Sequence, residues 1–202
     1  MKTLFIPARS IIDIEKSLKK VSIKGKIGLI TTIQFFNQLD KASKLIENSV
    51  IGGQVLGCNV KNAEKIKDKV DSFLYIGSGR FHPIQIAKKL KKPVYILNPN
   101  TDEFSKIEES EIQDYEKRLK GKLSKFFAAK SYGILVSTKN GQYNLKKAEL
   151  LRKKLKNSYI FICNNINENE FENFRNIDIW INTACTRIEG KNIINLEDLP
   201  EL

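Results

Sequence analysis

The chain has 202 residues, of which 41% are hydrophobic and 29% charged, so it is expected to fold as one large or two small globular domains rather than stay disordered. Its net charge of +12 comes mainly from Lys scattered over expected helix faces, without the interleaved aromatic residues of a nucleic-acid platform. No run approaches the roughly 18 apolar residues of a membrane span, so neither a membrane nor a nucleic-acid partner is expected.

Short apolar runs alternate with polar segments of helical period through the first hundred residues. Strands are expected at residues 3–7, 26–32, 52–56, 73–76 and 93–97, and helices at residues 12–20, 34–48, 62–69 and 83–90. This alternation is typical of parallel βα units. The Asn98-Pro99-Asn100 stretch has the composition of a turn or linker, so a first domain is expected to span residues 1–99.

A second domain is expected to span residues 100–202. It begins with a long charged segment, residues 103–130, that is helical by composition and that Gly121 could interrupt. Strands then follow at residues 132–138, 159–163 and 177–182, and helices at residues 145–155 and about 168–174. The predicted fold class is α/β, with two consecutive three-layer α/β/α domains and mainly parallel sheets.

The start of the chain predicts no secretion signal, because Pro7 and Arg9 interrupt the apolar stretch early. We therefore expect a cytoplasmic protein. The three cysteines form neither a C-x-x-C pair nor a zinc-binding spacing, and an odd number argues against a disulfide framework. Cys163 lies inside an apolar strand and is expected in the core. Cys58 and Cys185 instead follow strand ends in turns of small residues, where a sulfur could be exposed.

Four irregular turns end the expected strands, at Gly57-Cys58 and at residues 77–82, 139–142 and 183–187. Open parallel sheets bind ligands at the carboxyl ends of their strands, so these turns could form one composite site where the domains face each other. Polar, glycine-bearing turns also occur in α/β proteins without binding anything. The residues alone leave both interpretations open.

His82 is the only histidine, and it precedes Pro83 at an expected helix start, where a capping role and a binding role are both open. Residues 77–82 contain the first two glycines of a dinucleotide fingerprint, but His82 occupies the third glycine position. No P-loop motif occurs, so a nucleotide-phosphate motif is not favoured. A Ser-His-Asp hydrolase has no support either, because the G-x-S-x-G elbow is missing.

The same turns, taken in order, carry a family resemblance. Residues 53–58, 75–83, 137–142 and 183–187 read GQVLGC, YIGSGRFHP, STKNGQ and TACTR. Together they closely resemble the archaeal diphthamide synthase family, 2-(3-amino-3-carboxypropyl)histidine synthase, whose eukaryotic relatives form a two-subunit version. The resemblance runs over essentially all 202 residues.

The resemblance implies three related α/β domains around a [4Fe–4S] cluster, each giving one cysteine. The middle-domain cysteine falls on Cys58 and the last-domain cysteine on Cys185, whereas Cys163 matches no ligand. Three thiolates leave one iron open for S-adenosylmethionine. The implied reaction is a radical transfer of the 3-amino-3-carboxypropyl group from S-adenosylmethionine to a histidine of elongation factor 2, which begins diphthamide synthesis. The residues expected to contact S-adenosylmethionine or shape its pocket are Arg80, His82, Gln142 and Arg187.

Two features depart from the family pattern. The family's first domain and its cysteine have no counterpart here, so a separately encoded N-terminal domain or related subunit is expected to supply the third thiolate of a split enzyme. Thr186 stands where the family usually has proline, which loosens the turn without removing the thiolate of Cys185. The alternatives are a non-catalytic subunit of the same assembly, or an RNA- or ribosome-binding relative that lost the chemistry. We also expect an oligomer.

Overall fold

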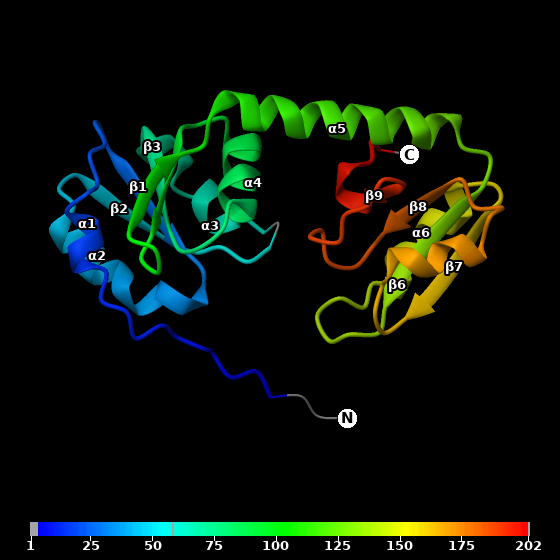
Figure 1. Cartoon of the computed structure of the whole chain (residues 1–202), viewed down its shortest axis with the longest axis horizontal. Coiled ribbons are helices and arrows are strands. Elements are labelled where there is room, and N and C mark those ends of the chain that lie inside the picture. Colours follow the sequence, from blue (N-terminus) through cyan, green and yellow to red (C-terminus); the bar gives the residue numbers. More distant parts are fainter. Residues whose placement is uncertain (1–3, 58, 202) are drawn as a thin grey trace. The chain divides into compact units, whose positions relative to one another are not determined.

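The computed structural model describes residues 4–57 and 59–201, and the chain divides into two compact units, Met1–Gln113 and Asp114–Leu202. Each unit is built on its own sheet, and the strands of both sheets are mainly parallel (Figure 1). The predicted α/β class with mainly parallel sheets is confirmed. None of the helices in the described part of the chain is long and apolar enough to cross a membrane.

The first sheet has the strand order β2-β1-β3-β4-β5, in which only β5 runs antiparallel to its neighbour. Its strands are β1 (Ile27–Thr31), β2 (Ser49–Gln54), β3 (Ser72–Ile76), β4 (Val94–Asn98) and β5 (Glu103–Lys106). The helical segments of this unit are α1 (Glu15–Leu18), η1 (Ile33–Gln38), α2 (Leu39–Leu45), α3 (Lys61–Glu64), η2 (Lys67–Lys69) and α4 (Phe81–Leu90).

The second sheet has the order β7-β6-β8-β9 and is parallel throughout. Its strands are β6 (Tyr132–Ser137), β7 (Ser158–Cys163), β8 (Ile179–Asn182) and β9 (Ile193–Asn195). The helical segments are the later part of α5 (Glu109–Ala128), α6 (Leu145–Lys154), η3 (Glu168–Asn173) and η4 (Leu196–Asp198). Both units therefore repeat one arrangement, with the first and third strands of the unit adjacent at the centre.

The first unit is a three-layer sandwich because its central strands are buried on both faces. Alternate side chains of β3 point to opposite sides, as the two-residue period of a strand requires. Phe73 and Tyr75 join a core with α3 and α4, whereas Leu74 and Ile76 join a second core with α1, η1 and α2. Helix α4 starts before Pro83, which costs nothing because the first-turn N–H groups of a helix have no partner within the helix.

The second unit is covered unequally. On one face, α5 and α6 pack against Ile134 and Val136 of β6. On the other face, Trp180 stacks on Phe171 with ring centroids 4.2 Å apart and meets Phe161 edge-on at 4.7 Å. This aromatic cluster lies under η3, a short 3₁₀ segment, where a full helix was expected.

The expected first strand is wrong over its described residues, which form no strand. The side chains of this apolar run are 75–83% exposed at Leu4, Phe5 and Ile6, so the described part of the chain does not bury them. The helix expected at residues 12–20 shrinks to the four residues of α1, and the one expected at residues 34–48 begins as the 3₁₀ segment η1.

The boundary between the units also differs from the expected division after residue 99. The Asn98-Pro99-Asn100 stretch starts a hairpin, in which Asp102 adopts a left-handed φ of 56°. The Oδ2 atom of Asp102 forms an ion pair with Lys20 Nζ at 2.6 Å. The hairpin returns the chain as β5 beside β4. Residues 103–106 were expected to be helical, but they complete the first sheet, and the division of the chain falls between Gln113 and Asp114.

The expected interruption at Gly121 does not occur, since α5 runs unbroken from Glu109 to Ala128. Gly121 is exposed, and a Cβ added there would meet no neighbouring heavy atom within 4 Å. We predict that Gly121→Ala raises the free energy of unfolding by about 1 kcal/mol, because glycine is the poorer helix former. Urea denaturation followed by circular dichroism measures this change.

Gly133→Ala is the matched control with the opposite sign. Its Cβ would lie 2.3 Å from the Trp180 ring, so we expect a loss of about 1–3 kcal/mol from overpacking. Stabilisation by Gly133→Ala would contradict the packing described for this face of the second sheet.

Candidate functional site

The carboxyl ends of β6 and β8 form the candidate site of the second unit. These strands are neighbours, while the chain continues from β6 to β7 on one side and from β8 to β9 on the other. Open α/β sheets bind ligands at such a reversal of strand order. The loop after β6 carries Gln142, and the loop after β8 carries Cys185 and Arg187. The fold therefore brings these three predicted residues to one edge of the sheet.

A side-chain amide ties the two loops together. Asn144 Nδ2 donates to the Thr183 carbonyl at 2.7 Å and to the Gln142 carbonyl at 3.5 Å. Thr183 is itself anchored, because its Oγ1 donates to the Leu135 carbonyl of β6 at 2.7 Å. Gln142 closes a turn by donating its backbone N–H to the Lys139 carbonyl at 3.0 Å. The half-buried Gln142 is thus held on a loop fixed to the one that carries Cys185.

A buried pair of amides lies under the cysteine loop. Asn182 and Asn195 are partners across β8 and β9, and they are only 2% and 7% exposed. Asn182 Nδ2 donates to Asn195 Oδ1 at 2.8 Å and to the Cys185 carbonyl at 2.8 Å, and its Oδ1 accepts the Ala184 N–H at 2.9 Å. Asn195 Nδ2 donates to the Thr186 carbonyl at 3.2 Å. The backbone on both sides of the Cys185 side chain is therefore fixed.

Asn144, Asn182 and Asn195 were not among the residues predicted from sequence. Asparagine at a strand end or in a turn is common, so nothing in the chain near each residue indicates a role. The pairing of Asn182 with Asn195 also depends on β9, a strand of three residues that is too short for an alternating pattern and was not predicted.

The two described cysteines both lie at this edge of the sheet, but in different surroundings. Cys185 is half-buried three residues beyond the end of β8. Cys163 is the last residue of β7 and is also half-buried, less enclosed than the core position expected for it. Burial, and secondarily the carboxylate of Glu170, raises the pKa of the Cys163 thiol. Metal binding requires the thiolate, so this environment disfavours Cys163 as a ligand.

Cys185 suits an iron ligand in chemistry and position, since thiolates hold iron–sulfur clusters and its loop is fixed from below. No three His, Cys, Asp or Glu residues gather in metal-binding geometry among residues 4–57 and 59–201. A cluster at Cys185 therefore needs thiolates from elsewhere. Cys58 lies outside the described residues; its neighbours Leu56 and Asn59 exchange backbone hydrogen bonds of 3.3 and 3.0 Å.

In the first unit, the loop after β3 places Arg80 against its own domain. The guanidinium Nε donates to Glu111 Oε1 at 2.6 Å, and Nη2 donates to the Lys106 carbonyl at 3.0 Å. Hydrogen bonding to Arg80 holds the pKa of the Glu111 carboxyl below its usual range, and the pKa of Arg80 is raised in turn. These bonds give Arg80 a structural role at the start of α5, beside any contact with a ligand.

His82 is half-buried in the first turn of α4. Its ring stacks on that of Tyr75, with centroids 5.8 Å apart, and meets Phe81 edge-on at 5.4 Å. The distance from Tyr75 Oη to His82 Nδ1 is 3.5 Å. Arg80 and His82 both follow β3, the third strand of the first unit, which lies next to its first strand β1. The Cys185 loop follows β8, which is likewise the third strand of its unit and lies next to the first strand β6.

We predict that Asn182→Ala lowers the free energy of unfolding by about 1–3 kcal/mol, because it leaves buried partners on Asn195 and the cysteine loop without their hydrogen bonds. Urea denaturation of Asn182→Ala, Asn195→Ala and the double variant measures the coupling between the two amides. Exposed Asn165 serves as the control, and its replacement by alanine should stay within about 0.5 kcal/mol. Additive effects at Asn182 and Asn195 would contradict the pairing.

We predict that the stabilisation provided by the ion pair between Arg80 and Glu111 depends on pH. Their side chains are 42% and 28% exposed, so a double-mutant cycle with Arg80→Ala and Glu111→Gln should give a coupling of about 0.2–1 kcal/mol near neutral pH. Because the pKa of Glu111 is lowered in the folded state, this stabilisation is present above its ordinary pKa and is lost as the pH falls through the lowered one. A coupling that grows on acidification would contradict this sign.

The structure resembles solved members of one family. It matches the crystal structure of Dph2 from Pyrococcus horikoshii with a 4Fe-4S cluster, with a TM-score of 0.80, 27% identity, and coverage of 93% of this chain and 61% of that chain. The 2-(3-amino-3-carboxypropyl)histidine synthase of Pyrococcus horikoshii is 30% identical over 92% of this chain, and that of Methanocaldococcus jannaschii is 33% identical over 93%.

The chain spans 59% and 56% of the length of these two relatives. A family model described as putative diphthamide synthesis protein matches residues 1–194. The resemblance carried by the turns after β2, β3, β6 and β8 is thereby confirmed, and the chain belongs to the diphthamide synthesis protein family.

Proposed function

We propose that this chain is a component of a diphthamide synthase, which transfers the 3-amino-3-carboxypropyl group of S-adenosylmethionine to a histidine of elongation factor 2. The observation that carries the proposal is the Cys185 loop, held by buried amides at the reversal of strand order in the second sheet, in a chain whose solved relative contains a 4Fe-4S cluster. Cys185 and Cys58 are the proposed cluster ligands.

The residues of the chain divide the work. The thiolates of Cys58 and Cys185 hold the cluster, which when bound supplies the electron that cleaves the bond from sulfur to the γ-carbon of S-adenosylmethionine. Arg187, exposed two residues beyond Cys185, offers a guanidinium suited to a carboxylate. Gln142 offers an amide from the loop that Asn144 ties to Thr183. Arg80 and His82 shape the pocket from the first unit.

The third thiolate comes from outside residues 1–202 in this proposal. Cys163 is the remaining cysteine of the chain, and its raised pKa makes it a poor substitute. A separately encoded N-terminal domain or related subunit is the proposed source, which makes the active enzyme an oligomer. Elongation factor 2 is the proposed protein substrate, in the cytoplasm.

The test is anaerobic co-expression with a candidate first-domain partner, followed by measurement of iron per complex and of labelled aminocarboxypropyl transfer to elongation factor 2. Iron and transfer that appear only with both chains support the split enzyme. A stable complex with neither would leave the chain a non-catalytic subunit. Salt-dependent RNA binding in the absence of iron would favour an RNA-binding relative.

Single cysteine variants give the sharper prediction within that complex. Cys185→Ala should lose the cluster absorbance and at least about 100-fold in transfer, because metal binding depends on the full set of thiolates. Cys163→Ala is the matched control and should keep both, since it removes a half-buried thiol on the same sheet edge. Retention of iron and activity by Cys185→Ala would remove this residue from the site.

A further inference from the structure

Gly121 is exposed on α5 and has open space beside it. A Cβ added there would meet no neighbouring heavy atom within 4 Å, although glycine is unfavourable in the interior of a helix. Gly121 lines a groove of about 480 Å³, bounded by α5 and by the loop of residues 189–191. Packing of the described residues therefore does not require glycine at this position, and its absence of a side chain leaves room against the helix.

The groove is strongly basic. Arg118, Lys122 and Lys125 line it from α5, and Lys191 lines it from the loop, against the single carboxylate of Glu189. The three α5 residues lie on the same helix face as Gly121 and span about 10 Å along the axis, at 1.5 Å per residue. Within the described part of the chain, Arg118 and Lys122 form no ion pair.

The loop that faces α5 is fixed in place. Lys125 Nζ donates to the Lys191 carbonyl at 3.0 Å and to Asn192 Oδ1 at 2.7 Å. On the other side, Glu168 Oε1 accepts the backbone N–H of Lys191 at 3.1 Å. A Cβ on Gly190 would come within 2.6 Å of the Glu168 carboxylate, so glycine is needed for this contact. Contacts within the chain therefore hold both walls of the groove, α5 and the loop of residues 189–191, in place.

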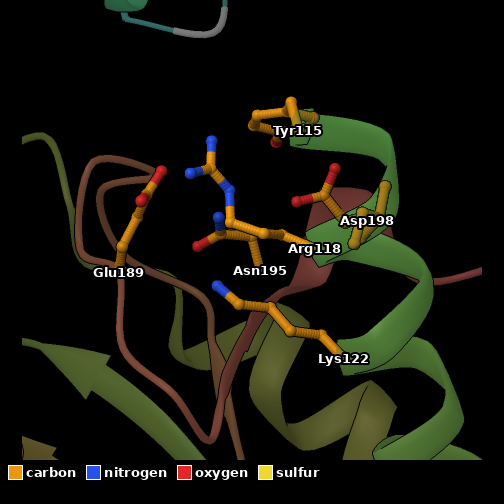
Figure 2. A pocket seen from close by; sticks show the side chains of 7 residues that line it. Tyr115, Arg118, Lys122, Glu189, Asn195 and Asp198 are labelled. Atoms are coloured by element: carbon orange, nitrogen blue, oxygen red, sulfur yellow. The ribbon is translucent and has the colours of Figure 1, made fainter. Parts of the chain in front are cut away.

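At one end the groove continues into a narrower pocket, shown in Figure 2. Arg118 and Lys122 extend from α5 into this pocket, and Glu189 reaches it from the facing loop. Asp198 adds a second carboxylate to the lining, so the groove and the pocket together carry four cations and two carboxylates. Asn195 lines the same pocket, and this is the buried amide that holds the Thr186 carbonyl. One of the two N–H groups of Asn195 Nδ2 is accounted for by that bond, which leaves a second donor for a ligand.

We propose that this groove binds a phosphate chain, lying over Gly121 with its charges on Arg118, Lys122 and Lys125. Guanidinium and ammonium groups both bind phosphate oxygens well. The cations that line the groove and the pocket outnumber the carboxylates, and a ligand with several negative charges would balance that excess. Glu189 then accepts from a hydroxyl or amino group at the end of the ligand. A nucleoside polyphosphate and the backbone of single-stranded RNA both carry this chemistry.

The test uses the full chain and three probes: inorganic tripolyphosphate, ATP, and a labelled single-stranded RNA oligonucleotide. Titration calorimetry and fluorescence anisotropy measure binding as a function of salt. We expect Arg118→Glu combined with Lys122→Glu to weaken binding at least about tenfold, and the log–log salt slope with RNA to be about −2 for three phosphate contacts. Binding of tripolyphosphate and ATP alone identifies a free nucleotide, and binding of RNA alone identifies a nucleic-acid backbone.

Gly121→Leu is the decisive variant, because it places a side chain in the groove without changing any charge and favours the helix. It should also weaken binding at least about tenfold, while circular dichroism shows an intact fold. Lys146→Glu combined with Lys153→Glu on α6 reverses the same charge away from the groove and should leave binding within about twofold. Absence of binding by all three probes, unchanged binding in Gly121→Leu, or an equal loss in the α6 variant would overturn the proposal.

Discussion

The central parallel strands of the two sheets, buried on both faces, are the constraint on which the rest of the structure depends. Every residue of β1 and β3 is buried and none carries a charged side chain, and the connections between the parallel strands run over the faces of the sheet. The candidate site residues Gln142, Cys185 and Arg187 accordingly lie in loops beyond the strand ends. The order of second, first, third and fourth strand, repeated in both units, then sets which loops are neighbours.

In the second unit this constraint leaves backbone carbonyls of the loop after β8 in need of hydrogen-bond donors, which two side-chain amides supply. The loop after β8 turns away immediately and carries backbone carbonyls at a buried edge, where an unpaired group would cost free energy. Asn182 and Asn195 satisfy the Cys185 and Thr186 carbonyls from below. The position of the cysteine is therefore set by Asn182 and Asn195, two buried residues beneath its loop.

Local patterns predicted the parts of the fold that bury apolar side chains. Strands β1, β3, β4, β6, β7 and β8 and helices α4 and α6 lie within a few residues of their expected positions. The apolar run at Leu4, Phe5 and Ile6 misled because apolar composition does not by itself imply a strand partner. Residues 103–106 misled because the hairpin that pairs them with β4 is a tertiary contact, which overrides their helical composition.

Sequence motifs placed the candidate site residues in loops that follow strands, since cysteine, glycine and arginine after a strand are visible in the chain. Gln142, Cys185 and Arg187 meet at one edge of the second sheet as expected. Asn144, Asn182 and Asn195 could not be found, because their roles arise from contacts between segments up to 39 residues apart. The composite site across both units remains a prediction, as does the role of each of these residues toward S-adenosylmethionine.

The central claim is that Cys185 holds iron. The most direct measurement is anomalous diffraction at the iron absorption edge from crystals of the anaerobically assembled complex. We predict an iron peak about 2.3 Å from Cys185 Sγ, the length of a metal–thiolate bond, and none beside Cys163. Iron that is fully bound in the complex yet distant from Cys185 would contradict the account.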